Sequence, residues 1–301
     1  MKIKRRPIKK GEIRSIIKND LDGTLIDFTS GLNNTSFNLD IFYKNIKTLK
    51  LEGTNGDKLN YNDSLSEYNL YENKIYYIFD KFKISIMHEL FHLASTIKTD
   101  KRIYSGFFQK DLETNEWIGY GLNEAYTAIL DDRYFADYVS NKREYVGNSY
   151  NLAKYFVSMI ESALGSSEME TFYSECNLYD LTKELSELTD FKSTIYFYRA
   201  LDYMALNHEN NKRLSKTTLL KMIDYALRYT AKVYFMIYNI LYIQGSITVK
   251  EYKEFLSVFK KQLQTPIIVG KYIKRKNKVV SDEEFKELQL QTREKALKKY
   301  T

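Results

Sequence analysis

The sequence predicts an α+β protein in which helices predominate. The chain of 301 residues is 44% hydrophobic and 28% charged, with 12 Gly and 2 Pro, a composition that excludes collagen-like and low-complexity chains. Alternating residues over 67–79 are typical of strands, whereas apolar residues recur at three- and four-residue intervals from about residue 82 onward. We therefore expect a small α+β front part followed by a helical rear part.

The front part begins with a basic tail, predicted over residues 1–20. Apolar residues at helical spacing predict a helix over 39–51, and the run 67–79 predicts one or two strands joined at Glu72-Asn73. A helix is expected from about Phe82 to Ile97.

After this helix, the polar segment 99–118 is predicted to be a loop, and a second helix is expected from Gly121 to Tyr138. We place the end of a front unit, residues 21–145, near this point. The rear unit, 146–301, is expected to pack on it, because no Gly-, Ser- or Pro-rich linker separates the two.

The rear part shows an almost continuous helical pattern. Pro266 and the apolar residues 267–269 interrupt it once, as a short strand or loop. Helices are expected over 150–164, 167–187, 190–208, 215–244, 248–263 and 282–299.

Cysteine usage and hydropathy predict a cytoplasmic protein. Cys176 is the single cysteine and cannot form an internal disulfide, so no oxidising compartment is implied. No apolar stretch follows the basic N-terminus, as a signal peptide would require. The most apolar segment, 233–245, is short for a bilayer span and contains Asn239 and Gln244, which favours a buried helix.

The net charge of +7 is concentrated at the ends of the chain, in residues 1–10, 271–278 and 295–300. Basic ends could contact a nucleic acid or an anionic surface. No zinc-finger spacing or aromatic RNA-binding strand accompanies them, so a solvated end is the favoured interpretation.

The motif that carries chemistry is His88-Glu89-Leu90-Phe91-His92, an HExxH sequence. Four residues are slightly more than one helical turn, so His88 and His92 project from one face and can bind one metal ion. Glu89 can then take a proton from a metal-bound water. The alternative is a pair of core histidines bonded to backbone carbonyls, which the intervening Glu and the scarcity of His make less probable.

A catalytic zinc site needs a third protein ligand. A metzincin would place Gly and His where Ser95 and Lys98 stand, so that class is excluded. Glu124 begins an apolar-periodic helix and is placed to enter the core, although a first-turn Glu is also favoured by the helix dipole. Four acids in the polar segment are alternatives that stay open: Asp100, Asp111, Glu113 and Glu116.

With HExxH on one helix and Asn123-Glu124 on the next, the stretch 67–138 resembles the gluzincin metallopeptidases of the thermolysin-like superfamily. The resemblance implies a zincin-like core of a small sheet, the HExxH helix and the Glu-ligand helix. It further implies Zn²⁺ bound by His88, His92 and Glu124, with Glu89 as general base. The strand that ends near Ile78 would offer an edge to an extended peptide.

The chain departs from the superfamily pattern one turn after Glu124, where Ala128 replaces an expected acid. Asp131, two turns on, could instead orient a ligand histidine. A Tyr or His commonly stabilises the oxyanion in such sites. Tyr120 is the first candidate for this role. Three other side chains are also candidates, each with packing or surface exposure as its alternative: Tyr126, Tyr134 and His208.

Two functions follow from these observations. The first is a zinc-dependent metallopeptidase that hydrolyses peptide bonds of a peptide or protein substrate, with Glu89 as general base. The second is an inactive module of the same fold that binds a protein or nucleic acid through its basic surface. An intact Glu89 favours the first.

Overall fold

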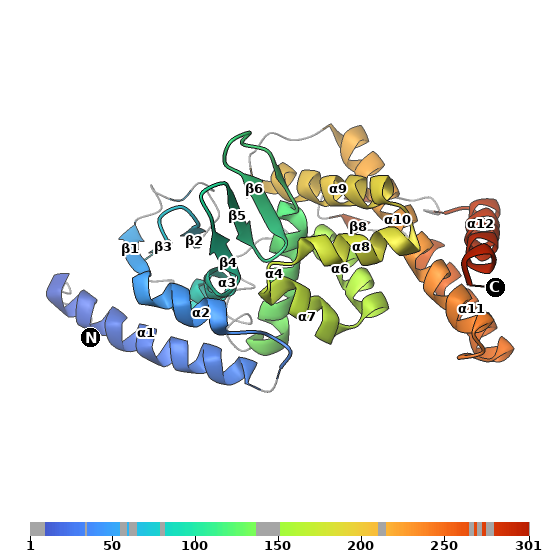
Figure 1. Ribbon diagram of the computed structural model, residues 1–301. Helices are drawn as coiled ribbons and strands as arrows, with labels where there is room; N and C mark the ends of the chain where they lie inside the picture. The colour runs from blue at the N-terminus through green and yellow to red at the C-terminus, as the bar shows by residue number, and fades with distance from the viewer. Residues whose placement is uncertain are drawn as a thin grey trace, which may run out of the picture.

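The computed structural model describes residues 10–33, 35–54, 59, 65–78, 82–136, 151–209, 215–264, 268–269, 273–274 and 280–300. These residues form an elongated molecule with small sheets toward one end and the C-terminal helices at the other (Figure 1). Helices predominate, as predicted. Helices α3 (Phe82–Ala94) and α4 (Tyr120–Tyr134) lie where the sheets meet the helical part.

The first sheet contains three strands in the order β1-β3-β2. Strand β1 (Lys50–Thr54) runs parallel to β3 (Lys74–Ile78), and β2 (Ser66–Asn69) runs antiparallel to it. One or two strands are expected over 67–79, and the structure has two, β2 and β3, joined through Glu72 and Asn73. Because β3 is the central strand, the expectation that it offers an edge to a peptide is wrong; β2 and β1 are the outer strands.

The segment before this sheet differs from the prediction in two places. Helix α1 (Lys10–Leu32) covers half of the expected basic tail and continues well beyond it. The helix expected over 39–51 is shorter, with α2 (Asp40–Asn45) and the 3₁₀ turn η1 (Ile46–Thr48) leading into β1. Phe28 packs α1 against α2 and α3, because its ring centroid lies 5.1 Å from the ring centroids of both Phe42 and Phe91.

The second sheet occupies the segment predicted to be a loop. It is a four-stranded antiparallel meander in the order β4-β5-β6-β7, with β4 (Thr96–Lys98), β5 (Arg102–Ser105), β6 (Phe108–Asp111) and β7 (Trp117–Ile118). Its strands are short and rich in polar residues, so their alternation is too brief to be recognised in the sequence. The meander connects α3 directly to α4.

The helical part follows the predicted pattern closely. Its helices are α6 (Asn151–Leu164), α7 (Ser166–Ser174), α8 (Leu178–Leu188), α9 (Phe191–Glu209), α10 (Lys216–Ile243), α11 (Val249–Gln264) and α12 (Asp282–Tyr300). The helix expected over 167–187 is two helices, α7 and α8. Cys176, between them, has a φ of 57°, which interrupts the right-handed helical backbone. Residues 268–269 and 273–274 form a two-stranded ladder, β8 and β9.

One continuous hydrophobic core contains side chains from both the front and the rear part, from Phe28 to Phe285. The boundary expected near residue 145 lies outside the described residues. Because this core is shared, the front and rear parts pack against each other, and α4 contacts α6 and α9 as well as α3.

Within the described part of the chain, no helix is long and apolar enough to span a membrane.

The two parts approach each other closely at Gly121, in the first turn of α4. A Cβ atom on Gly121 would lie 2.1 Å from the carbonyl oxygen of Leu201 in α9. We expect Gly121→Ala to lower the free energy of unfolding by about 1–3 kcal/mol through overpacking, although Ala is the better helix former. Urea unfolding followed by circular dichroism measures this change.

Gly23 in α1 provides the matched control, because a Cβ atom there meets nothing within 4 Å. Gly23→Ala should leave stability unchanged or raise it by up to about 1 kcal/mol. Equal stabilities of the two variants would contradict the close approach of α4 and α9.

Candidate metal centre

His88 and His92 lie on the same face of α3, as the motif predicts. Their ring centroids are 4.9 Å apart, and their side chains are 11% and 8% exposed. The helix is surrounded by core side chains because its remaining faces carry apolar residues such as Leu90 and Phe91, both fully buried. The two imidazoles are therefore enclosed within the protein.

Glu124, from the first half of α4, faces both rings. Its Oε2 lies 3.3 Å from Nε2 of His88, and its Oε1 lies 3.4 Å from Nε2 of His92. One ligand atom from each of the three residues lies within 4.8 Å of the others. His88, His92 and Glu124 could therefore hold one metal ion.

The second nitrogen of each ring also faces a polar side chain of α4. Nδ1 of His88 lies 3.8 Å from Oδ2 of Asp131, and Nδ1 of His92 lies 3.2 Å from Nδ2 of Asn123. Asn123 is itself held by the backbone N–H of Phe107, which donates to its Oδ1 at 3.1 Å. Both rings thus present Nε2 toward Glu124, and Asp131 lies beside the ring of His88.

The electrostatics of Glu124 combine two opposed effects. Burial by itself raises the pKa of the Glu124 carboxyl. The charge of His92, together with hydrogen bonds from both histidines, outweighs burial and holds the pKa below its ordinary range. The carboxyl is therefore ionised at neutral pH, which is the form that binds a cation.

Glu89 points toward β2. Its Oε1 accepts a hydrogen bond from Ser66 Oγ at 2.9 Å, and its Oε2 accepts one from the backbone N–H of Tyr68 at 2.8 Å. Glu89 is 7% exposed, so its carboxylate lies between the HExxH helix and the outer strand of the first sheet.

The tyrosine candidates have packing partners. The ring of Tyr120 lies 6.1 Å from that of Trp117 and 6.2 Å from that of Phe108. The hydroxyl groups of Tyr126 and Tyr134 donate to two buried acids of α6 and α7. His208 lies in the last turn of α9, and its side chain is outside the described residues.

The acids that were alternatives to Glu124 lie in and around the second sheet. Asp111 ends β6 and accepts hydrogen bonds from the backbone N–H groups of Glu113 and Thr114, each at 2.9 Å. Asp100, Glu113 and Glu116 are exposed. Among the described residues, His88, His92 and Glu124 form the single group of three with metal-ligand spacing.

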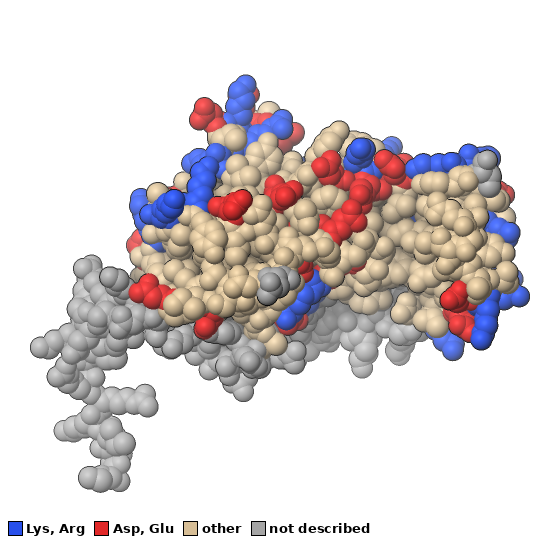
Figure 2. All heavy atoms as spheres, turned by 60° about the horizontal axis from the view of Figure 1, so that its bottom comes forward, with Lys and Arg blue, Asp and Glu red and all other residues tan. Residues whose placement is uncertain are grey.

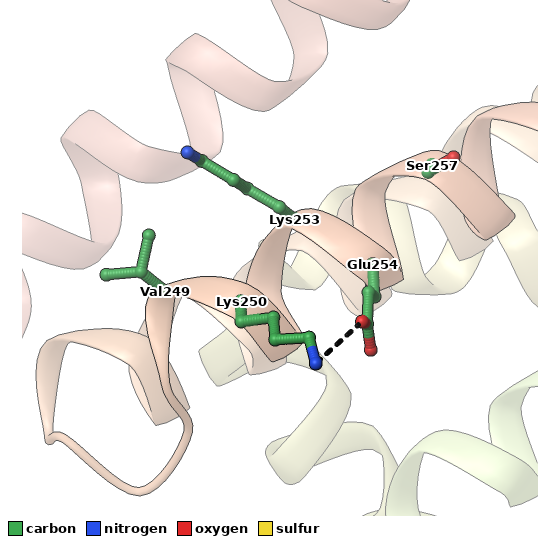
Figure 3. Close-up of a pocket in the computed structure, with 5 residues that line it drawn as sticks. All are labelled: Val249, Lys250, Lys253, Glu254 and Ser257. Carbon is green, nitrogen blue, oxygen red and sulfur yellow. Dashed lines mark ion pairs between the residues drawn. The ribbon is translucent and has the colours of Figure 1, made fainter.

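Two other features of the surface are a hollow on α11 and the distribution of the charged side chains. A hollow of about 500 Å³ is lined by one face of α11, from Val249 to Ser257, where Lys250 lies 3.9 Å from Glu254 (Figure 3). On the face drawn in Figure 2, acidic and basic side chains form several separate groups, and no continuous basic band crosses its described part. Neither feature adds a convergent set of reactive groups.

A comparison of the chain with protein-family models, curated proteins and solved structures found no match.

The contact between α4 and the rear part was missed in the sequence. Asp202 of α9 accepts hydrogen bonds from the start of α4 across 81 positions of sequence. Asp202 is buried, and in the sequence it is an acidic residue at an apolar position of a helical pattern. An acid at such a position needs a hydrogen-bond partner, which is the one sequence signal that points to its role.

Proposed function

We propose that the protein is a zinc-dependent metallopeptidase. The observation that carries the proposal is the convergence of His88, His92 and Glu124, whose ligand atoms lie within 4.8 Å of one another. The helix that carries the two histidines also carries Glu89. Two imidazoles and one carboxylate with an open fourth position form a common catalytic zinc set, whereas structural zinc sites favour four closed ligands that include Cys.

The arrangement of the rings supports the fit of a metal ion. A histidine that binds metal through Nε2 holds its proton on Nδ1 and shares it with a polar partner, which fixes the ring. Asp131 lies 3.8 Å from Nδ1 of His88 and is such a partner, whereas the group at Nδ1 of His92 is the amide nitrogen of Asn123, a donor, which does not take this role. Both Nε2 atoms then face Glu124, so the three ligands are oriented by the same helix pair.

The chemistry assigned to this chain is hydrolysis of a peptide bond. Bound zinc would lower the pKa of a water molecule and polarise the substrate carbonyl. Glu89 would serve as the general base that takes a proton from the attacking water and passes it to the leaving amine. Its two carboxylate oxygens are held by Ser66 and Tyr68, and each oxygen has further capacity to accept a hydrogen bond.

The position of β2 supports the role of Glu89. Ile78 N–H donates to Leu65 O, so the alternation of an antiparallel ladder turns the main-chain groups of Ser66 and Tyr68 away from β3. The outward-facing N–H of Tyr68 donates to Oε2 of Glu89, and the Ser66 hydroxyl donates to its Oε1. This side of β2 therefore holds the carboxylate of the proposed general base.

The test compares zinc-loaded wild-type protein with Glu89→Gln on a library of peptides, with new termini identified by mass spectrometry. We expect cleavage by the wild type that ceases when zinc is chelated. Glu89→Gln should retain zinc but lose cleavage by at least about 100-fold, because general-base catalysis contributes about 10²–10⁴-fold. Gln preserves the shape of the side chain: its oxygen can accept from Tyr68 N–H, and its amide nitrogen can donate to Ser66 Oγ.

Glu116→Gln is the matched control, since Glu116 is an exposed acid in the connection between β6 and β7. This variant should cleave like the wild type. Undiminished cleavage by Glu89→Gln would overturn the proposal. Zinc binding without cleavage by the wild type would favour the inactive binding module instead.

A further inference from the structure

One turn of α9 holds the connection that leads from β7 into α4. Nη1 of Arg199 donates to the carbonyl oxygen of Trp117 at 2.5 Å. Oδ1 of Asp202 accepts from the backbone N–H of Gly121 at 2.9 Å, and its Oδ2 accepts from that of Gly119 at 3.4 Å. The backbone of Tyr120 also bonds to this carboxylate. Asp202 therefore binds consecutive amide groups at the N-terminus of α4.

Helix α4 has no cap of its own. The first N–H groups of a helix lack partners within the helix, and a Ser, Thr, Asp or Asn at the N-cap position usually accepts from them. Here the N-cap residue is Gly119, with a φ of 82° and no side chain. A side chain at this position would collide with the backbone, because a Cβ atom would lie 2.2 Å from Phe107 O. The cap is consequently supplied by another helix.

The cap is enclosed by protein. Asp202 is 3% exposed, and burial raises the pKa of its carboxyl to about 6 despite the backbone donors and the nearby Arg199. At neutral pH the carboxylate is charged and lies at the positive end of the α4 dipole. Backbone contact at Gly121 and Leu201 adds a rigid support beside it. A displacement of this turn of α9 would therefore move the first turn of α4.

The metal-facing residues follow directly along α4. Asn123, which contacts His92, and Glu124, which faces both histidines, lie within the first turn and a half after the cap. We propose that Asp202 is a positioning residue for the metal centre: by capping α4 it sets the place of Glu124 relative to His88 and His92. The inference rests on the proposed metal site and assigns part of that site's geometry to the helical rear of the chain.

The test is a double-mutant cycle on zinc affinity, measured at pH 7 in the full chain by competition with a chelator. Asp202→Ala should raise the Kd for zinc by about 10–100-fold, as changes in residues that orient metal ligands do. In a Glu124→Ala background the same substitution should leave the Kd unchanged within about twofold, because the ligand that the cap positions is no longer present.

Asp202→Asn keeps one acceptor oxygen and nearly the same shape but turns an amide donor toward a backbone N–H, so it should raise the Kd by less than Asp202→Ala but measurably. It serves if the Ala variant fails to fold. Glu251→Ala is the matched control, since Glu251 caps the distant helix α11 by accepting from Thr248 N at 2.7 Å. It should leave the Kd unchanged.

Two outcomes distinguish the inference from the proposed function. If Glu124→Ala by itself leaves zinc affinity unchanged, the ligand set is wrong. If Glu124→Ala weakens binding but folded Asp202→Ala and Asp202→Asn bind zinc like the wild type, the positioning role alone is overturned. An equal loss from Asp202→Ala in both backgrounds would overturn it too, because the effect would not act through Glu124.

Discussion

Replacement of Glu124 by Ala is expected to weaken zinc binding by at least about 100-fold, more than the loss of a residue that only orients a ligand. The variant loses both a ligand oxygen and the negative charge between His88 and His92, whose Nε2 atoms lie 3.3 and 3.4 Å from the carboxylate. Zinc content after dialysis and the Kd from chelator competition measure the change.

Metal removal provides an independent measurement of the same site. A ligand that binds the folded state stabilises it by about 4 kcal/mol when present at 1,000 times its Kd. A chelator should therefore lower the Tm of the zinc-loaded wild type but hardly affect Glu124→Ala. Glu124→Gln, which keeps the size of the side chain, gives the same comparison if the Ala variant is poorly folded.

The control addresses the acids that the sequence left as alternatives. Glu113→Ala and Glu116→Ala remove exposed carboxylates of the second sheet and should bind zinc like the wild type. Zinc lost in either of these variants but retained in Glu124→Ala would show that the third ligand lies elsewhere.

Replacement of Arg133 by Met is expected to lower the free energy of unfolding by about 1–3 kcal/mol, the usual cost of leaving buried acceptors without a donor. The Arg133 side chain is 28% exposed, which keeps the expected loss below that of a fully buried pair. Arg133, in the last turn of α4, lies 2.7 Å from Oε1 of Glu161 in α6 and 2.7 Å from Oε1 of Glu170 in α7. These acids are 6% and 4% exposed. Met fills much of the same volume but leaves both carboxylates without the cation that they share.

Urea unfolding measures the effect, and two further variants interpret it. Arg102→Met removes an arginine whose side chain is 56% exposed and lies 3.6 Å from Asp111, so it should cost no more than about 1 kcal/mol. Adding Glu161→Gln and Glu170→Gln to Arg133→Met should recover part of the lost stability, because no unpaired charge remains buried. A loss below about 1 kcal/mol in Arg133→Met would contradict the importance of this network.

These contacts give the rear helices a role at the proposed site. Asp202 holds the beginning of α4, and Glu161 and Glu170 hold its end through Arg133. The helix that carries Glu124 is therefore positioned at both ends by residues of the helical part. Truncation near residue 145 would remove these three acids.

The sequence by itself determined the parts that depend on local geometry. Helical periodicity located most of the rear helices to within a few residues, because a buried helix repeats apolar residues every three to four positions. The spacing of His88 and His92 required a shared face on any helix. Glu124 could be chosen among the acids because it begins an apolar-periodic helix, whereas its rivals stand in a polar segment.

The tertiary structure decided what depends on distant contacts. Helix α1 is held by Phe28 against Phe42 and Phe91, and the strands of the second sheet form through pairing rather than through a recognisable alternation. Asp202 reaches Gly121 across 81 positions, so no local pattern could identify it as the cap of α4. Backbone groups require hydrogen-bond partners, but partners far along the chain are selected only when the helices pack.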